Sequence, residues 1–277
     1  MTPDFDFDRE TAVVAVDEHR YEATLDRSWW VHRGPNGGYL AAIVMRAFEA
    51  TVDDAERSAR SLTIHYAAPP GDGNLSIATR VERAGRSLTS CSARLEQDGR
   101  LVGLALAAFS APRPGPEFCD RQPPRVPRPE ELPEQDQPAN PNVEIPPIAR
   151  RWEYRWAFGQ PGSEGEEARS GGWLRLPEGH VADAAVVAAM TDAWVPPLFA
   201  RHDAPTVVVP TVDLTVHFRT ALPHAGARPD DWVLASFRTD VAAEGFLEED
   251  GELWSPDGVL LAQSRQLAAM LPLGPPG

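Results

Sequence analysis

Lysine is missing from the 277 residues, so all 26 basic side chains are arginine. Its absence excludes chemistry that needs a lysine amine, such as a Schiff base or the lysine of a phosphate-binding loop. Cysteine is scarce as well, since only Cys91 and Cys119 occur. Two cysteines cannot form a disulfide framework or a cysteine zinc site, so we expect two free thiols and no metal.

Long apolar runs are also absent, and the first residues are acidic, so no segment resembles a signal peptide or a membrane span. Acidic residues outnumber basic ones by 41 to 26, which gives a formal net charge of −15. That charge disfavours nucleic acid or an anionic membrane as the main partner. We therefore expect a cytoplasmic globular protein, in which any anionic ligand needs a local arginine cluster.

The pattern of strands and helices occurs twice. Residues 11–25 predict a hairpin, and a helix with Asn36 as its N-cap follows, before an antiparallel meander over residues 61–109. A second pair of strands, helix and meander starts near residue 152. Leu214–Phe218 repeats Leu62–Tyr66 at an offset of 214 minus 62, or 152. The repeat predicts two similar units that pack together as an intramolecular pseudo-dimer.

A proline-rich strap, residues 112–147, separates the two repeats. It contains twelve of the chain's 28 prolines and few aliphatic residues, which indicates an extended connection with little regular structure. The predicted units are therefore residues 1–111 and 148–274, on either side of this strap.

The second helix is predicted over His180–Phe199, which is apolar almost all round and has one acid, Asp192, in its middle. Burying an ionised carboxylate without partners costs several kcal/mol, so Asp192 needs hydrogen-bonding partners. The helix alone leaves two interpretations open. Asp192 is either a structural acid held by backbone donors or a catalytic group.

The turn Asn36-Gly37-Gly38 precedes the first helix. Its small residues leave backbone amides at the positive helix end, which suits a developing oxyanion or a phosphate. A tight turn into a buried helix would have the same sequence. Arg33, Arg83, Arg86 and Arg94 are candidates for binding phosphates, or are solvated surface charges.

Four motifs carry a resemblance to a known family: Gly34–Ala42, Thr191–Trp194, Thr211–Phe218 and Gly258–Gln266. In this order they resemble the acyl-CoA thioesterase II (TesB-like) proteins over almost the whole chain. The resemblance implies an α+β double hot-dog fold, in which a sheet wraps a long central helix in each half. It implies an acyl-CoA substrate and no cofactor, and we expect a homo-oligomer. Asp213-Leu214 and Gln266-Leu267-Ala268 depart from the family pattern, which bears on substrate choice.

The resemblance also implies that Asp192, Thr211 and Gln266 hold a water. Asp192 would act as general base, Thr211 would orient the water and Gln266 would fix its position. Strict strand alternation turns Thr211 away from the helix, so either a bulge or Pro210 turns it inward, or it is only a strand threonine. The corresponding alternative for Gln266 is an ordinary surface glutamine. By the offsets 152 and 159, Thr211 and Gln266 correspond to Ala59 and Ala107, so we expect a single site per chain.

Two other functions remain open on sequence alone. The chain could bind acyl-CoA or another lipid without turnover, with Asp192 as a structural acid. It could also hydrate or dehydrate an enoyl thioester with His180 and Asp192, although the Asp-x-Asn-Pro-x-His pattern of hot-dog hydratases is absent.

Overall fold

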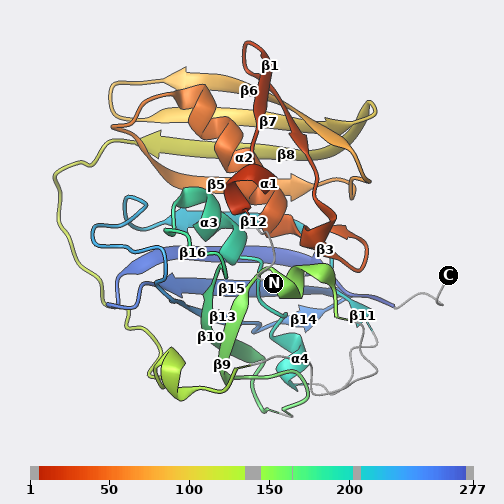
Figure 1. Ribbon diagram of the computed structural model, residues 1–277, viewed down its shortest axis with the longest axis vertical. Helices are drawn as coiled ribbons and strands as arrows, with labels where there is room; N and C mark the ends of the chain where they lie inside the picture. Colours follow the sequence, from red (N-terminus) through yellow and green to blue (C-terminus); the bar gives the residue numbers. More distant parts are fainter. Residues whose placement is uncertain (1–5, 135–144, 164, 202–206, 273–277) are drawn as a thin grey trace.

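The computed structural model describes residues 6–134, 145–163, 165–201 and 207–272. Within these ranges the main feature is one antiparallel sheet of 13 strands. The course of this sheet through the molecule can be followed in Figure 1. Its first strands come from residues 14–110, here called the first half: β1 (Val14–Asp17), β2 (Arg20–Thr24), β5 (Ser58–Tyr66), β6 (Asn74–Ala84), β7 (Thr89–Gln97) and β8 (Arg100–Ser110).

The remaining strands of the sheet come from residues 153–269, here called the second half: β9 (Glu153–Phe158), β10 (Arg169–Arg175), β12 (Thr211–Phe218), β13 (Val233–Arg238), β14 (Ala242–Ala243), β15 (Phe246–Trp254) and β16 (Leu260–Ala269). The spatial order is β1-β2-β6-β7-β8-β5-β12-β16-β15-β13-β10-β9, with β14 paired to β15. Two small ribbons lie outside this sheet: β3 (Trp30–Val31) with β4 (Gly34–Pro35), and β11 (Val207–Val208) with β17 (Leu271–Pro272).

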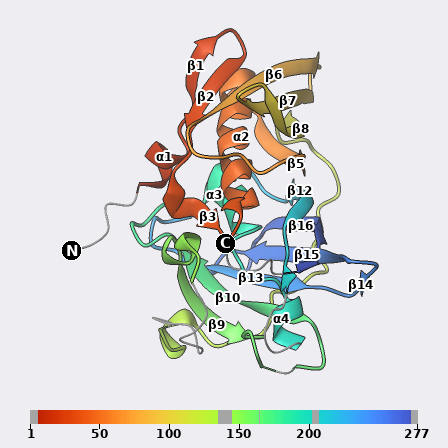
Figure 2. The same ribbon diagram turned by 90° about the vertical axis from the view of Figure 1, so that its right-hand side faces the viewer.

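Four α-helices and three short 3₁₀ turns complete the described elements: α1 (Phe7–Glu10), α2 (Gly37–Val52), α3 (Ala184–Met190), α4 (Leu198–Arg201), η1 (Arg27–Trp29), η2 (Pro129–Glu131) and η3 (Pro147–Arg150). None of these helices is long and apolar enough to cross a bilayer. Figure 2 shows that α2 and α3 lie on the same side of the sheet, which bends around them.

The two halves join edge to edge at β5 and β12. Thr63 lies opposite Thr215, and their hydroxyls are 3.0 Å apart. Leu62 pairs with Val216 and Ile64 with Leu214, so residues related by the offset of 152 exchange places across this point. The repeat found in the sequence therefore corresponds to a local two-fold relation at the middle of one continuous sheet.

A bulge interrupts the same position of both central strands. In β12 the register to β16 shifts between Thr211 and Asp213, and in β5 the register to β8 shifts between Ala59 and Ser61. Of the alternatives for Thr211, the bulge is the one that the structure contains. Because an extra residue exchanges the two faces of a strand, the alternation that holds from Asp213 onward does not apply to Thr211.

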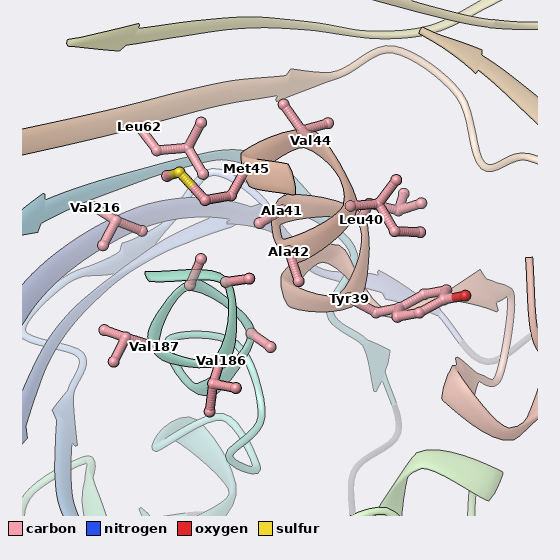
Figure 3. Packing of buried hydrophobic residues seen from close by; sticks show 14 of the residues in the cluster. Tyr39, Leu40, Ala41, Ala42, Val44, Met45, Leu62, Val186, Val187 and Val216 are labelled. Carbon is pink, nitrogen blue, oxygen red and sulfur yellow. The ribbon is translucent and has the colours of Figure 1, made fainter. Parts of the chain in front are cut away.

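Helix α2 forms as predicted. The Asn36 side chain caps it by accepting from the Tyr39 amide at 3.0 Å, and Asp53 ends it in a left-handed conformation. Most of the helix is buried, and its contact with α3 relies on Ala41 and Ala42, whose small side chains allow a close approach (Figure 3). Leu62 and Val216 point from β5 and β12 toward the two helices.

The predicted helix over His180–Phe199 is wrong in length. Helix α3 begins at Ala184, because Asp183 caps it by accepting from the Val186 amide, and it ends at Met190. Thr191 donates its hydroxyl to the Ala188 carbonyl, and the next amides bond three residues back instead of four. Asp192 therefore lies in the turn after the helix and not in its middle.

The described part of the strap has little regular structure, only η2 and the first residue of η3, in agreement with its composition. The Trp173 indole donates to the Pro127 carbonyl at 2.9 Å, while Val126 and Leu132 pack with Trp173, Leu234 and Trp254. The strap is thus anchored on the second half. Both cysteines are free thiols, Cys91 buried and Cys119 exposed.

A buried ion pair ties α1 to the segment that follows the strap. Arg151 is fully buried, and its guanidinium contacts the Glu10 carboxylate and lies 4.6 Å above the Trp29 ring. Glu10 also accepts from the Trp29 indole at 2.9 Å, and its backbone carbonyl accepts from the Tyr39 hydroxyl at 2.7 Å.

Arg151→Met should lower the free energy of unfolding by about 3 to 5 kcal/mol, because it removes the buried cation from Glu10 and leaves, among the described residues, only the exposed Arg9, 3.6 Å away. Urea unfolding at pH 7 measures the loss. The control is Arg94→Ala, which removes an exposed ion pair to Glu96 and should cost less than about 1 kcal/mol. Equal losses in the two variants would contradict this account of the buried pair.

Candidate active site

Asp192 lies where the end of α3 meets the start of α2. One carboxylate oxygen, Oδ2, accepts from the Asn36 amide group at 2.9 Å and from the Gly38 backbone amide at 3.0 Å. Asn36 also donates to the Asp192 backbone carbonyl at 2.8 Å. The carboxylate is therefore held at the positive end of α2, where helix amides and the helix dipole favour a negative charge.

Burial raises the pKa of Asp192 to about 6, and hydrogen bonds, chiefly from Gly38, Gln266 and Gly37, oppose that rise. Removal of the carboxylate from water disfavours its charged form more than these donors favour it. Such a group is mostly ionised at pH 7 and yet takes up a proton more readily than an ordinary aspartate. Those are the properties of a general base.

Thr211 and Gln266 form a directed chain of hydrogen bonds beside this carboxylate. The Thr211 hydroxyl donates to the Gln266 Oε1 at 2.9 Å, and the Gln266 Nε2 donates to the Glu249 Oε1 at 2.8 Å. Gln266 is only 6% exposed. The structure thus brings together the three residues that the sequence grouped, from the turn after α3, β12 and β16.

Glu249 is a member of this site that the sequence analysis missed. It is 4% exposed and lies on β15 directly opposite Gln266 on β16. Its pKa is raised to about 8, mainly by burial and also by the neighbouring Asp192, while the hydrogen bond from Gln266 opposes the rise. Strand alternation in the sequence could have indicated that Glu249 is buried, because it shares the buried face of β15 with Leu247, Gly251 and Leu253.

Two tyrosines hold the backbone around Asp192. The Tyr66 hydroxyl donates to the Gly37 carbonyl at 2.7 Å, and the Tyr154 hydroxyl donates to the Ala193 carbonyl at 2.7 Å. Burial raises the pKa of Tyr66 well above its ordinary value, and the nearby Asp192 adds to that rise. Both tyrosines therefore act as neutral donors that fix the segments on either side of the carboxylate.

Gly37 and Gly38 permit this close arrangement. A Cβ at Gly38 would lie 2.4 Å from the Ala189 carbonyl oxygen and 3.0 Å from the Asp192 Cβ, and one at Gly37 would lie 2.9 Å from the Asp192 Oδ2. The amides assigned from the sequence to an oxyanion face the Asp192 carboxylate in this structure. Asn36, Gly37 and Gly38 thus lie at the site, in contact with the proposed base.

The matching place in the first half lacks every one of these polar groups. Cys91 lies opposite Ala107 on β7 and β8, as Glu249 lies opposite Gln266 on β15 and β16. Ala59 occupies the bulge that Thr211 occupies in the second half. The scaffold is repeated and the polar cluster is not.

The four arginines suggested for phosphate binding are all exposed. Arg33 lies between β3 and β4, three residues before Asn36, whereas Arg83 and Arg86 lie at the β6–β7 hairpin. Arg94 pairs with Glu96 on β7 at 2.7 Å. Of the four, Arg33 is nearest in sequence to the site.

His180 is not arranged as a partner of Asp192. Its Nε2 lies 3.1 Å from Asp8 and its Nδ1 2.7 Å from the Val181 carbonyl. Asp8, His180 and Asp183 are close enough to hold a cation, but the Arg46 guanidinium already contacts both carboxylates, at 2.5 and 3.0 Å. The positive charge of Arg46 disfavours a metal ion there.

Models of two thioesterase domains match most of the chain. The acyl-CoA thioesterase N-terminal domain matches residues 26–110, and the acyl-CoA thioesterase C-terminal domain matches residues 129–270. The second match alone covers more than half of the sequence. This chain belongs to the acyl-CoA thioesterase family.

Solved structures agree with this family membership. A hot-dog protein of unknown function from Alicyclobacillus acidocaldarius has a TM-score of 0.87 and 27% identity, covering 98% of each chain. A protein from Thermobifida fusca, described only as a candidate thioesterase II, has a TM-score of 0.81 and 27% identity over 98% of this chain and 99% of its own.

More distant relatives share the fold. The acyl-CoA thioesterase II TesB2 from Mycobacterium marinum has a TM-score of 0.77 at 17% identity, covering 97% of this chain and 99% of its own. No curated protein matches this thioesterase-family chain in sequence.

Gly38→Ala should lower both stability and turnover, because the new methyl group overlaps the Ala189 carbonyl and displaces Asp192 from the start of α2. Thermal unfolding and thioester hydrolysis measure the two effects. Gly115→Ala is the control, since a Cβ there meets nothing within 4 Å and no change is expected. Parent-like stability and activity of Gly38→Ala would show that α2 and α3 do not require this contact.

Proposed function

We propose that this protein is an acyl-CoA thioesterase, which hydrolyses an acyl-CoA thioester to a free acid and CoA. The observation that carries the proposal is the cluster of Asp192, Thr211 and Gln266 beside the start of α2, in a chain of this family. No metal or cofactor is needed when a carboxylate can take the proton from water.

In the proposed reaction, Asp192 accepts a proton from a water that attacks the thioester carbonyl carbon. Thr211 donates its own proton to Gln266, so its oxygen is free to accept the second hydrogen of that water. The tetrahedral intermediate then expels the CoA thiolate, which receives a proton from the Asp192 carboxyl. The base is thereby returned to its ionised form.

The start of α2, at Asn36, Gly37 and Gly38, is our proposed location for the developing oxyanion. Because these groups already donate to the Asp192 carboxylate, their contribution to the oxyanion would come from the field of the helix end. Charge that develops near a helix N-terminus is stabilised by the partial positive charge there. Arg33 is the first candidate for a CoA phosphate, followed by Arg83, Arg86 and Arg94.

We propose that the fold is a double hot-dog of two units, residues 1–111 and 148–274, connected by the strap. The repeated strand order, the two matching bulges and the Thr63–Thr215 contact support this division. A cytoplasmic location and a homo-oligomer remain part of the proposal.

Two alternatives are less well supported. A hydratase would need a histidine next to Asp192, whereas His180 contacts Asp8 and the Val181 carbonyl. A binding protein without turnover would need Asp192 only as the acceptor that joins the start of α2 to the turn after α3, and that role does not require the paired threonine and glutamine beside it.

The test is release of free thiol from a panel of acyl-CoAs, from acetyl to palmitoyl. The parent should hydrolyse at least one member, and Asp192→Asn should reduce its turnover by about 10² to 10⁴, the usual worth of a positioned general base. Substrate affinity should change little. Binding without thiol release by the parent would favour the binding protein, and a folded Asp192→Asn with turnover within about threefold of the parent would remove Asp192 as the base.

The acid limb of the pH profile gives a further prediction. Asp192 must be ionised to accept a proton, and its pKa is raised to about 6, so kcat/KM should fall about tenfold per pH unit below that value. If the base had the pKa of an ordinary aspartate, kcat/KM would begin to fall only at a pH about two units lower. Tryptophan fluorescence controls for unfolding in acid. A flat profile down to pH 5 in a folded enzyme would contradict the assignment.

A further inference from the structure

We propose that Glu249 is a positioning residue that fixes the orientation of the Gln266 side-chain amide, and through it the donor presented to Asp192 and its water. The inference rests on the proposed function and extends it by a residue outside the family's expected set. Glu249 would touch neither the substrate nor the reacting atoms.

The contact between Glu249 and Gln266 is direct and buried. The two residues lie opposite each other on β15 and β16, and the Gln266 Nε2 donates to the Glu249 Oε1 at 2.8 Å. Their exposed fractions are 4% and 6%. Water therefore competes little for this hydrogen bond, which makes it an effective constraint on the amide.

The orientation of the amide matters because its two ends differ. Thr211 donates to the Gln266 Oε1, so the NH₂ group lies toward Glu249 and has a second hydrogen for the Asp192 side. If the amide rotated by half a turn, its oxygen would face the Glu249 carboxylate, and Thr211 would meet a donor. An acceptor at position 249 disfavours that state.

The fold itself gives no reason for this acid. Among the described residues no arginine or histidine forms an ion pair with Glu249, and burying a carboxylate without one is costly. Cys91 occupies the corresponding place in the first half, next to Ala107. An acid occurs only in the half where a glutamine needs an orientation.

The charged groups around Glu249 make the pair sensitive to pH. Asp192 faces it from the turn after α3, while Glu248 and Asp250 flank it on β15, and all three raise its pKa, which burial brings to about 8. Arg238 and Arg265 contact Asp250 instead. Around pH 7, Asp192 is therefore the ionised member and Glu249 the protonated one, which can accept from Gln266 or donate to a rotated amide. Glu249 thus fixes the amide orientation fully only when it ionises, above about pH 8.

Three variants test the proposal by thiol release over pH 5 to 10. Glu249→Leu removes the acceptor and should lower kcat by about 10- to 100-fold, the effect of a misplaced catalytic group, with little change in KM. Glu249→Gln allows either amide orientation and should show a smaller loss. The parent profile should carry a second inflection near pH 8 that is missing in both variants. Cys91→Ala is the control from the first half and should match the parent.

A second measurement does not depend on turnover. The Gln266 side-chain amide is assigned by its absence from the NMR spectrum of Gln266→Ala, and its shift is followed with pH. In the parent it should change with a midpoint near pH 8, and in Glu249→Gln that midpoint should be absent.

The outcomes separate the two proposals. Parent-like kcat and pH profile in Glu249→Leu, or a Gln266 signal that titrates identically in the parent and Glu249→Gln, would overturn the role of Glu249 and leave the thioesterase proposal intact. A folded parent that releases no thiol from any acyl-CoA would overturn the thioesterase proposal and, with it, any effect of Glu249 on catalysis. The NMR titration would still show whether Glu249 orients Gln266.

Discussion

The attachment of the Asp192 carboxylate to the start of α2 is the contact on which the rest of the site depends. Asn36 and Gly38 belong to the first half, and Asp192 belongs to the second, so this contact crosses between them. It requires the ends of two helices to approach within backbone contact. Only a residue without a side chain at position 38 allows that approach. The same donors stabilise the ionised carboxylate, while burial keeps it basic.

A repeated scaffold explains how one chain builds a site of this kind only once. Both halves supply a strand pair, a helix and a meander, and both carry a bulge at the same place in the central strand. The first half contributes the helix start with its donors, and the second contributes the acid, the hydroxyl and the Gln266 amide. The first-half equivalents of Thr211, Glu249 and Gln266 are Ala59, Cys91 and Ala107, which are small and offer no hydroxyl, carboxylate or amide side chain. The repeated strands and helices thus provide the packing, and the polar residues present in the second half alone provide the proposed chemistry.

Much of the fold could be predicted from the sequence because local signals agreed with tertiary structure. Alternation located β5 and β12, and Asn36 capped α2 as its position indicated. The conflict between alternation and function at Thr211 left a bulge as one of three alternatives, and the structure contains the bulge. The grouping of Asp192, Thr211 and Gln266 came from family resemblance, and the hydrogen bonds place these residues side by side.

Two features could not be predicted for physical reasons. The apolar run around α3 gave no sign that Thr191 would bond back to the Ala188 carbonyl and that the chain would turn there, because an apolar segment is buried whether or not it is helical. Glu249 lies in a run of acids, Glu248 to Asp250, that resembles a solvated surface. Alternation can indicate that Glu249 is buried, but only the pairing of β15 with β16 shows that it faces Gln266.

The central claim is that Asp192 activates a water and does not itself attack the substrate. A single turnover in H₂¹⁸O, with enzyme in excess over acyl-CoA, distinguishes these two routes. If Asp192 is a general base, the acid released in the first turnover carries one ¹⁸O atom, and the peptide that contains Asp192 carries none. An unlabelled acid from that first turnover, with ¹⁸O recovered in the Asp192 carboxylate, would contradict the account.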